Sequence, residues 1–382
     1  MKRMHVAGMM LLTYLLMTSG CSGWLSKRAL QNGTNAMKHG DFATAVKQFE
    51  RASHTITDSP DLYFDLGRSY QQLTPPNLDL AIKNYKAALN LKPTDTDCMI
   101  CIGEIYLQRQ QWDEATAIYE QAGGQAPDAR VLTALAQAAK GAGHTDAARI
   151  YLIRALIANH SCAPALYDLG CLYRDVYMIP AEAIEQFELY LRTADSTDPR
   201  VPKAHEKVSA LKQVVGRQAL LPAGTKRDPG AAVKLVAEGD KQRTAKQLPK
   251  AEKAYRDALA ADPLSQDAAF NLALICKDKK NLPEALKLLL RAASMEPLRQ
   301  ATLVEAAQTA IAVKDYPTAS RMLDRLIATS PTFAPAYASM AVVRLAQGQK
   351  SAARVYAEQF VRLAPPGPDR DHYEKWAATL PR

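Results

Sequence analysis

The chain has 382 residues and a formal net charge of +9, and 48% of its residues are hydrophobic although only 7% are aromatic. This length exceeds what one compact hydrophobic core usually serves, so the sequence excludes a small single-core domain. Alanine and leucine dominate the apolar residues, which favours helices.

The first twenty residues form a predicted targeting segment that is separate from the fold. Lys2 and Arg3 give a positive start, residues 6–17 are uncharged and mostly apolar, and residues 18–20 are small and precede Cys21. This pattern is typical of a secretory signal. An uncleaved membrane anchor is the alternative, but about fourteen apolar residues are fewer than the roughly twenty that span a bilayer.

Small residues followed by Cys21 resemble the cleavage box of bacterial lipoproteins, although Thr18 stands where that family usually has an aliphatic residue. The resemblance implies that Cys21 becomes the new N-terminus and carries palmitate-type acyl chains, with residues 21–25 as a short tether. Several acyl chains would make the membrane attachment stable. Ser22 resembles lipoproteins that are sorted to the outer membrane, which implies a place on its inner leaflet, facing the periplasm.

A pair of helices is clearest in residues 98–127. Gly103 and Tyr106 lie on one face of a first helix, and Ala115 and Tyr119 recur at helical spacing in a second helix that ends at a proline. Gly103 and Ala115 are small where two antiparallel helices would cross, so the backbones can approach closely. The aromatic rings then fill the space on either side.

This pair resembles the tetratricopeptide repeat (TPR), which has two helices and a period of 34 residues. Generic amphipathic helices would not keep one phase over about 300 residues. The first alanine of the second helix recurs at Ala45, Ala81, Ala115, Ala148, Ala183, Ala251, Ala285, Ala319 and Ala353. The resemblance implies an all-α fold: a right-handed superhelical solenoid of about nine helix pairs with a C-terminal capping helix.

The phase of the repeats divides the chain into two arrays. Repeats 1–5 are expected in residues 26–196 and repeats 6–9 in residues 232–367, and residues 368–382 should form the capping helix. Residues 197–231 are predicted to be a degenerate repeat or basic linker, because two prolines and two glycines within residues 222–230 interrupt the helical pattern.

The basic excess is local. From Arg200 to Ala260 the chain has fourteen Lys or Arg residues and six Asp or Glu residues. This segment is either a linker kept soluble by lysine or a surface for lipid headgroups or an acidic partner segment. We expect no nucleic acid partner, because the signal predicts export from the cytoplasm.

Motifs for catalysis, metal binding or phosphate binding are missing from the sequence, so we expect no enzyme, no cofactor, no metal and no small-molecule substrate. Cysteine is the one candidate for chemistry. Cys98 and Cys101 have redox spacing at the start of a helix, where the helix dipole could lower a thiol pKa. A structural or incidental role, a disulfide and catalysis all stay open for this pair, and a disulfide between Cys162 and Cys171 is also open.

Function is therefore expected from the concave groove of the solenoid. In TPR proteins the first helix of each repeat lines this groove. When the repeats are aligned by their period of 34 residues, a polar set of residues falls on the N-terminal part of the groove and an apolar set on its C-terminal part. The predicted ligand-binding residues are Phe64, Arg68, Gln71, Glu104, Gln137, Lys140, Tyr167 and Arg174, and then Phe270, Leu274, Val304 and Ile311. The cations of the first set favour a partner segment with carboxylates or a free C-terminus.

The sequence thus predicts a scaffold that is anchored to the bacterial envelope by lipid and binds a protein or peptide in its groove. It resembles TPR lipoproteins that assist envelope assembly, secretion or pilus biogenesis. The alternative is a thiol-redox or other envelope enzyme that uses Cys98 and Cys101.

Overall fold

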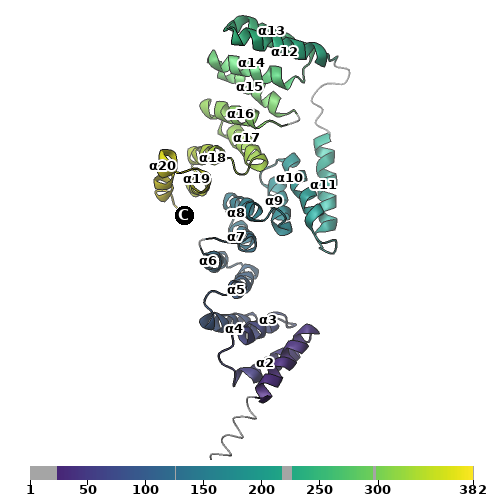
Figure 1. The fold of residues 1–382 in the computed structure, drawn as a ribbon, viewed down its shortest axis with the longest axis vertical. Coiled ribbons are helices and arrows are strands. Elements are labelled where there is room, and N and C mark those ends of the chain that lie inside the picture. The colour runs from purple at the N-terminus through teal and green to yellow at the C-terminus, as the bar shows by residue number, and fades with distance from the viewer. Residues whose placement is uncertain (1–23, 125, 217–225, 296–297, 382) are drawn as a thin grey trace, which may run out of the picture. The chain divides into compact units, whose positions relative to one another are not determined.

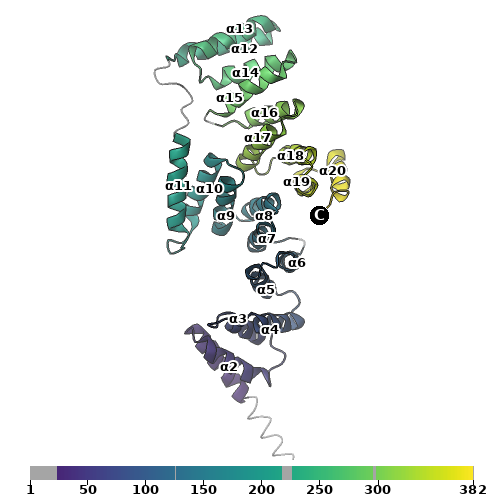
Figure 2. The ribbon, with the colours of Figure 1, turned by 180° about the vertical axis from the view of Figure 1, so that it is seen from behind.

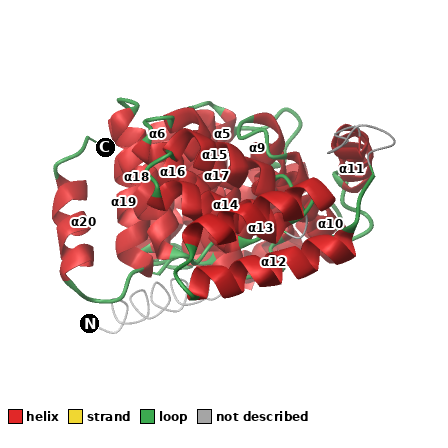
Figure 3. Cartoon of the chain, turned by 90° about the horizontal axis from the view of Figure 1, so that it is seen from above, coloured by secondary structure: helices red, strands yellow, loops and turns green. Residues whose placement is uncertain are grey.

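The computed structural model describes residues 24–124, 126–216, 226–295 and 298–381. All regular elements in these ranges are helices (Figure 3), which confirms the expected all-α class. None of the described helices is both long and apolar enough to cross a membrane. The predicted signal, Cys21 and Ser22 lie outside the described residues, as do residues 217–225 of the predicted linker.

The chain divides into two compact units, and the first comprises Met1–Gly143. Its described part begins with a helix over residues 24–38, which includes the last two residues of the expected tether. Successive helices pack in pairs, and α5 also contacts α7. The further helices are α2 (Phe42–Ser53), α3 (Pro60–Gln71), α4 (Leu78–Leu91), α5 (Thr96–Gln108), α6 (Trp112–Gly123) and α7 (Ala129–Gly141).

The second unit comprises His144–Arg382. Successive helices pack on one another here too, within α8 to α11 and again within α12 to α20. They are α8 (Thr145–Ala158), α9 (Ala163–Asp175), α10 (Pro180–Thr193), α11 (Val201–Gly216), α12 (Pro229–Thr244), α13 (Leu248–Ala261), α14 (Gln266–Asp278), α15 (Leu282–Ala293), α16 (Gln300–Ala312), α17 (Tyr316–Thr329), α18 (Ala334–Ala346), α19 (Lys350–Leu363) and α20 (Pro368–Ala378).

Contacts between glycine and an aromatic ring set the distance between the two helices of a repeat. A Cβ atom on Gly103 of α5 would overlap the ring of Tyr119 of α6, and a Cβ on Gly67 would lie 2.8 Å from the ring of Tyr85. Both rings are fully buried. The predicted close crossing at Gly103 is therefore present, and the hydrophobic core lies between paired helices.

The turn between the two helices of a repeat needs a residue in the left-handed region. Lys246, Lys280, Lys314 and Gly348 occupy this place at intervals of 34 residues, with φ values of 57°, 60°, 62° and 80°. Glycine adopts this conformation without steric cost, whereas lysine does not. The backbone thus repeats with the period that the sequence predicts.

The C-terminal helix α20 covers the last helix pair. The rings of Phe360 on α19 and Tyr373 on α20 lie 4.6 Å apart, and Arg354 donates a hydrogen bond of 3.0 Å to the carbonyl of Leu380. Ala377 and Leu380 are buried. This is the capping helix that the sequence predicts.

The second unit differs from a simple array in which each repeat contacts only its neighbours. Helix α8 contacts α19, and α10 contacts α17. Figures 1 and 2 both show α8–α10 beside α17–α19, although more than a hundred residues separate them in the sequence. The chain of this unit therefore closes on itself through the second helices of distant repeats.

Candidate functional site

The predicted groove set has members in both units. In the first unit, Phe64 and Gln71 of α3 both contact Tyr85 of α4. The ring centroids of Phe64 and Tyr85 lie 5.7 Å apart, and the Tyr85 hydroxyl donates a hydrogen bond of 2.7 Å to Oε1 of Gln71. Both side chains are half-buried, so they serve the packing of one helix pair and offer a ligand only part of their surface.

Arg68 of α3 and Glu104 of α5 are exposed, and both charges affect the pKa of the same thiol, that of Cys101. Burial raises the pKa of Cys101 to about 11, a hydrogen bond with Tyr85 lowers it, Glu104 raises it further and Arg68 lowers it. Partial desolvation of its carboxylate by the surrounding helices also raises the pKa of Glu104, although the residue is exposed as a whole. The structure thus brings one predicted cation and one predicted anion to neighbouring places on α3 and α5.

Two further members of the set, Gln137 and Lys140, lie exposed on α7, which contacts α5. The first helices α5 and α7 of two successive repeats are therefore adjacent, as the predicted groove requires. We call Arg68, Glu104, Gln137 and Lys140 the polar face of the first unit.

Tyr167 and Arg174 of α9 belong to the second unit, and α11 covers the tyrosine. Lys207 of α11 donates a hydrogen bond of 2.6 Å to the Tyr167 hydroxyl, and the Lys207 ammonium lies 4.7 Å from the centre of the ring. Only 9% of Tyr167 is exposed. Arg174 is partly exposed and pairs with Asp175 at 2.5 Å. The aromatic contact area expected from Tyr167 is thus occupied by the chain itself.

The apolar C-terminal members lie on two neighbouring first helices. Phe270 and Leu274 on α14 and Val304 and Ile311 on α16 are all half-buried. An ion pair between Lys277 on α14 and Glu305 on α16 shows that these two faces adjoin. We call these four residues the apolar face of the second unit.

The thiols of Cys98 and Cys101 are not activated. None of the five described cysteines forms a disulfide, so neither the Cys98–Cys101 nor the Cys162–Cys171 bridge is present. Burial is the largest cause that raises the pKa of Cys98, to about 12, although its backbone amide caps onto Asp95 at the start of α5. A pKa lowered by the helix dipole, one of the open alternatives, is therefore not supported, because burial raises the pKa of this thiol. Within the described residues there is also no group of three or more His, Cys, Asp or Glu that could hold a metal ion.

The second unit contains a buried polar cluster that was not predicted from the sequence, and we call it the Arg149 cluster. Arg149 on α8 is fully buried, and its Nη1 donates a hydrogen bond of 2.6 Å to Oδ1 of Asp324 on α17. Its guanidinium carbon lies 3.9 Å from the centre of the Tyr177 ring. The members are Asp146, Arg149, Tyr177, Asp324, Arg344 and Tyr356.

Asp146 is the second carboxylate of the Arg149 cluster. It accepts hydrogen bonds from Arg344 Nη2 at 3.1 Å, from the Tyr356 hydroxyl at 2.5 Å and from the Tyr177 hydroxyl at 2.9 Å. Burial alone would raise the pKa of Asp146, but the Arg149 and Arg344 charges and these hydroxyls outweigh it, so the pKa is lowered. Two guanidinium groups thus balance two carboxylates inside the unit.

A separate ion pair supports the same closure. Arg325 on α17 pairs with Glu182 on α10 at 2.7 Å and donates a second hydrogen bond of 2.7 Å to the carbonyl of Ala293. Glu182 is buried. Both charge networks therefore join α8–α10 to α17–α19. In the sequence, the charged residues of these networks cannot be distinguished from ordinary solvent-exposed residues on the outer face of a helix.

The fold and these faces define a helical-repeat protein. Two segments of the chain, residues 77–138 and 236–299, match family models described as tetratricopeptide repeat. The chain therefore contains tetratricopeptide repeats in these two segments. TPR repeats are typical of non-enzymatic scaffolds, and the matches support a scaffold for protein–protein interactions. No curated protein sequence matches the chain.

Solved structures of TPR proteins resemble the chain at low identity. MamA (41-end) from Desulfovibrio magneticus RS-1 is 18% identical with a TM-score of 0.40, and the match covers 45% of this chain and 97% of that chain. YrrB, a TPR protein with an unusual peptide-binding site, is 16% identical with a TM-score of 0.32, covering 71% and 100%. The TPR2AB domain of yeast Sti1, solved in a pHSP90 complex, is 21% identical with a TM-score of 0.29, covering 69% and 98%. Similarity at this level carries no argument about function.

Proposed function

We propose that the chain is a lipid-anchored, periplasm-facing TPR scaffold of the bacterial cell envelope, which holds protein partners for envelope assembly, secretion or pilus biogenesis. The lipoprotein-like segment that ends at Cys21 supports the anchor and the location. The repeats support the scaffold. The two proposals rest on different residues and can fail separately.

One observation carries the binding function: charged side chains on the first helices α3, α5 and α7 remain solvent-exposed. Arg68 and Lys140 are exposed cations on the polar face, and no ion pair is formed by either within the described part of the chain. A structural role would have paired or covered them, as it does for Arg149. We therefore propose that the polar face binds a partner segment that carries carboxylates or a free C-terminus.

The apolar face of the second unit gives a second contact area for the same kind of partner. Phe270 and Leu274 keep part of their surface exposed beside the Lys277–Glu305 pair. Aromatic side chains of this kind often dominate the energy of an interface.

The anchor is tested by Cys21→Ser, because cleavage and acylation both need the thiol. We expect the variant to leave the membrane fraction or to keep its signal, as measured by fractionation and by mass spectrometry of the N-terminus. A membrane-bound variant with a cleaved N-terminus would exclude the lipoprotein proposal.

The binding face is tested by crosslinking and pull-down from membranes with Arg68→Glu/Lys140→Glu. We expect the partners of the wild type to be lost while the circular dichroism melt is unchanged, because both residues are exposed. Lys47→Glu/Lys86→Glu is the matched control, with the same charge change on exposed residues of the second helices α2 and α4. If both double variants keep the partners, the polar face is not the site, and Phe270→Ala/Leu274→Ala tests the apolar face.

A further inference from the structure

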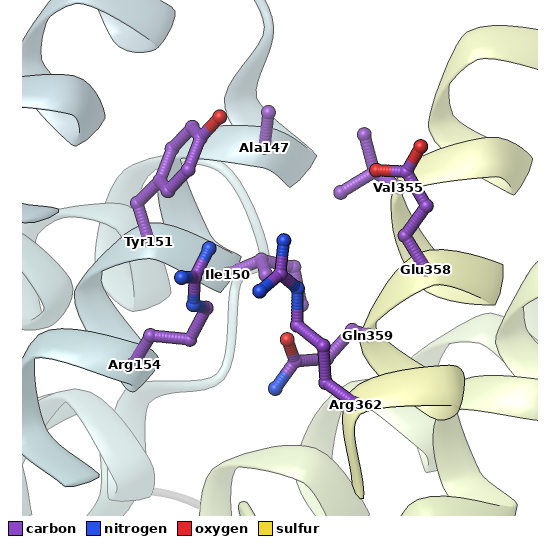
Figure 4. A pocket seen from close by; sticks show the side chains of 8 residues that line it. All are labelled: Ala147, Ile150, Tyr151, Arg154, Val355, Glu358, Gln359 and Arg362. Carbon is purple, nitrogen blue, oxygen red and sulfur yellow. The ribbon is translucent and has the colours of Figure 1, made fainter. Parts of the chain in front are cut away.

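A small cavity lies in the second unit where α8 and α19 meet. Its volume is about 60 Å³, and its polar lining comes from Tyr151 and Arg154 of α8 and from Glu358, Gln359 and Arg362 of α19. Figure 4 shows the guanidinium groups of Arg154 and Arg362 directed toward each other across this space. Since both helices are second helices of their repeats, the cavity is separate from the predicted groove.

The positive charge in the cavity is not neutralised. Among the described residues, neither Arg154 nor Arg362 forms an ion pair. The one carboxylate in the lining, Glu358, is already held by Arg354 at 2.7 Å. Burial and the nearby Arg362 both lower the pKa of Arg154, which is the direction expected for two like charges held close together.

A buried amide lines the same cavity without a partner for its oxygen. Gln359 is only 2% exposed, and its Oε1 has no hydrogen-bond partner. Rotation of the amide by half a turn would place Nε2, a donor, where Oε1 now lies. A buried polar atom without a partner costs free energy, and in the rotated amide Nε2 could donate to an acceptor in the cavity, which would remove that cost.

We propose that this cavity is an oxyanion site that takes one phosphate or carboxylate group. The two guanidinium groups supply charge-assisted hydrogen bonds, and the Gln359 amide supplies a neutral one. A volume of about 60 Å³ exceeds the minimum for one water several-fold, so it admits one small oxyanion but no nucleotide. The anion is either free or an acidic group of a bound peptide, and the site does not depend on the function proposed for the polar face.

An anion in this place would also stabilise the closure of the unit. It would sit between α8 and α19, which approach from opposite ends of the unit in sequence. Binding to the folded state alone raises the melting temperature as the ligand concentration rises.

The test measures inorganic phosphate binding to the full chain by calorimetry, with chloride keeping the ionic strength constant, together with the melting temperature. We expect Arg154→Gln and Arg362→Gln each to weaken phosphate binding about tenfold, the usual size for one charge-assisted hydrogen bond. Gln359→Leu should weaken binding less. Arg192→Gln removes an exposed arginine of α10 outside the cavity and should bind like the wild type.

A second readout separates the site from a merely structural role. Without phosphate, Arg362→Gln should melt at a higher temperature than the wild type, because it relieves the repulsion from Arg154. If phosphate binds the Arg154→Gln/Arg362→Gln chain as well as the wild type, or binds neither, the proposal is wrong. N-acetyl-tetraglycine and its C-terminal amide distinguish the source: binding of the acid alone, lost in the double variant, indicates a peptide carboxylate, and binding of phosphate alone indicates a free anion.

Discussion

Arg149 and Asp324, which are 175 residues apart in the sequence, form a hydrogen-bonded ion pair of 2.6 Å inside the second unit. Arg149 is fully buried, and only 6% of Asp324 is exposed. Tyr177 and Tyr356 enclose the guanidinium, and Asp146 and Arg344 complete the charge balance. A solenoid of neighbouring repeats does not require this pair, so its energetic role can be isolated by mutation.

Arg149→Met should destabilise the second unit by about 3–5 kcal/mol, because it leaves buried carboxylates without their partner. The double variant Arg149→Met/Asp324→Leu should recover much of that loss, since it removes both charges. Urea unfolding followed by circular dichroism measures both. Arg51→Met on α2 replaces an exposed arginine and should change stability by less than about 0.5 kcal/mol. A single variant as stable as the wild type would show that the pair contributes nothing.

The contribution of Asp146 to stability should depend on pH. Its pKa in the folded state is lowered from the ordinary 3.8, so near that value the unfolded chain binds more protons and stability rises with pH. The stabilisation is therefore complete above the ordinary pKa and is lost as the pH falls through the lowered one. We expect the difference in unfolding free energy between the wild type and Asp146→Asn to be largest near pH 6 and to shrink toward pH 2. A difference that is constant over this range contradicts the lowered pKa.

Cys98 and Cys101 should resist alkylation in the folded chain. With a pKa of about 11, only about one Cys101 thiol in a thousand is ionised at pH 8, and Cys98 is also fully buried. Mass spectrometry after iodoacetamide treatment should find both unmodified, whereas chain unfolded in guanidinium should react at both. Rapid modification of either thiol in the folded state would contradict this prediction and would support the alternative that the two cysteines have a redox function.

Lys314→Gly should stabilise the turn between α16 and α17. Lys314 has a φ of 62°, a conformation that costs an L-residue about 1–2 kcal/mol and glycine almost nothing. After the greater entropy of glycine in the unfolded chain is deducted, about 0.5–1 kcal/mol of stabilisation should remain. Lys314→Ala removes the same charge but keeps the strain, so it should give no gain. Equal stability of the glycine and alanine variants would refute the backbone explanation.

The parts of the fold that the sequence predicted are those set by contacts within one repeat. Gly103 against Tyr119 and the turn residues at intervals of 34 follow from local spacing, and so does the capping helix with its Tyr373. Within α11, Ala204, Val208 and Leu211 follow helical spacing in the sequence, and all three are buried.

The parts that it did not predict depend on contacts between distant repeats. Tyr167 occupies a groove position of its repeat, but Lys207 of α11 covers it. Because α11 lies outside the regular repeats, the period of the sequence does not indicate which neighbouring helices it packs against. Arg149 has the phase of a solvated residue, yet α17 and α19 enclose it. The cavity with Arg154 and Arg362 arises from the same closure. The sequence alone could not indicate that these residues line one cavity, because it does not show that α8 and α19 are in contact.

The Arg149–Asp324 pair also sets an order of events during synthesis. Asp324 is made 175 residues after Arg149, which takes roughly 9–35 s at about 5–20 residues per second. Throughout that interval Arg149 lacks Asp324, so an interrupted product that ends before α17 leaves the Arg149 cluster incomplete. Chains that end before α17 should therefore be less stable than the complete chain, and quality-control proteases should degrade them before assembly.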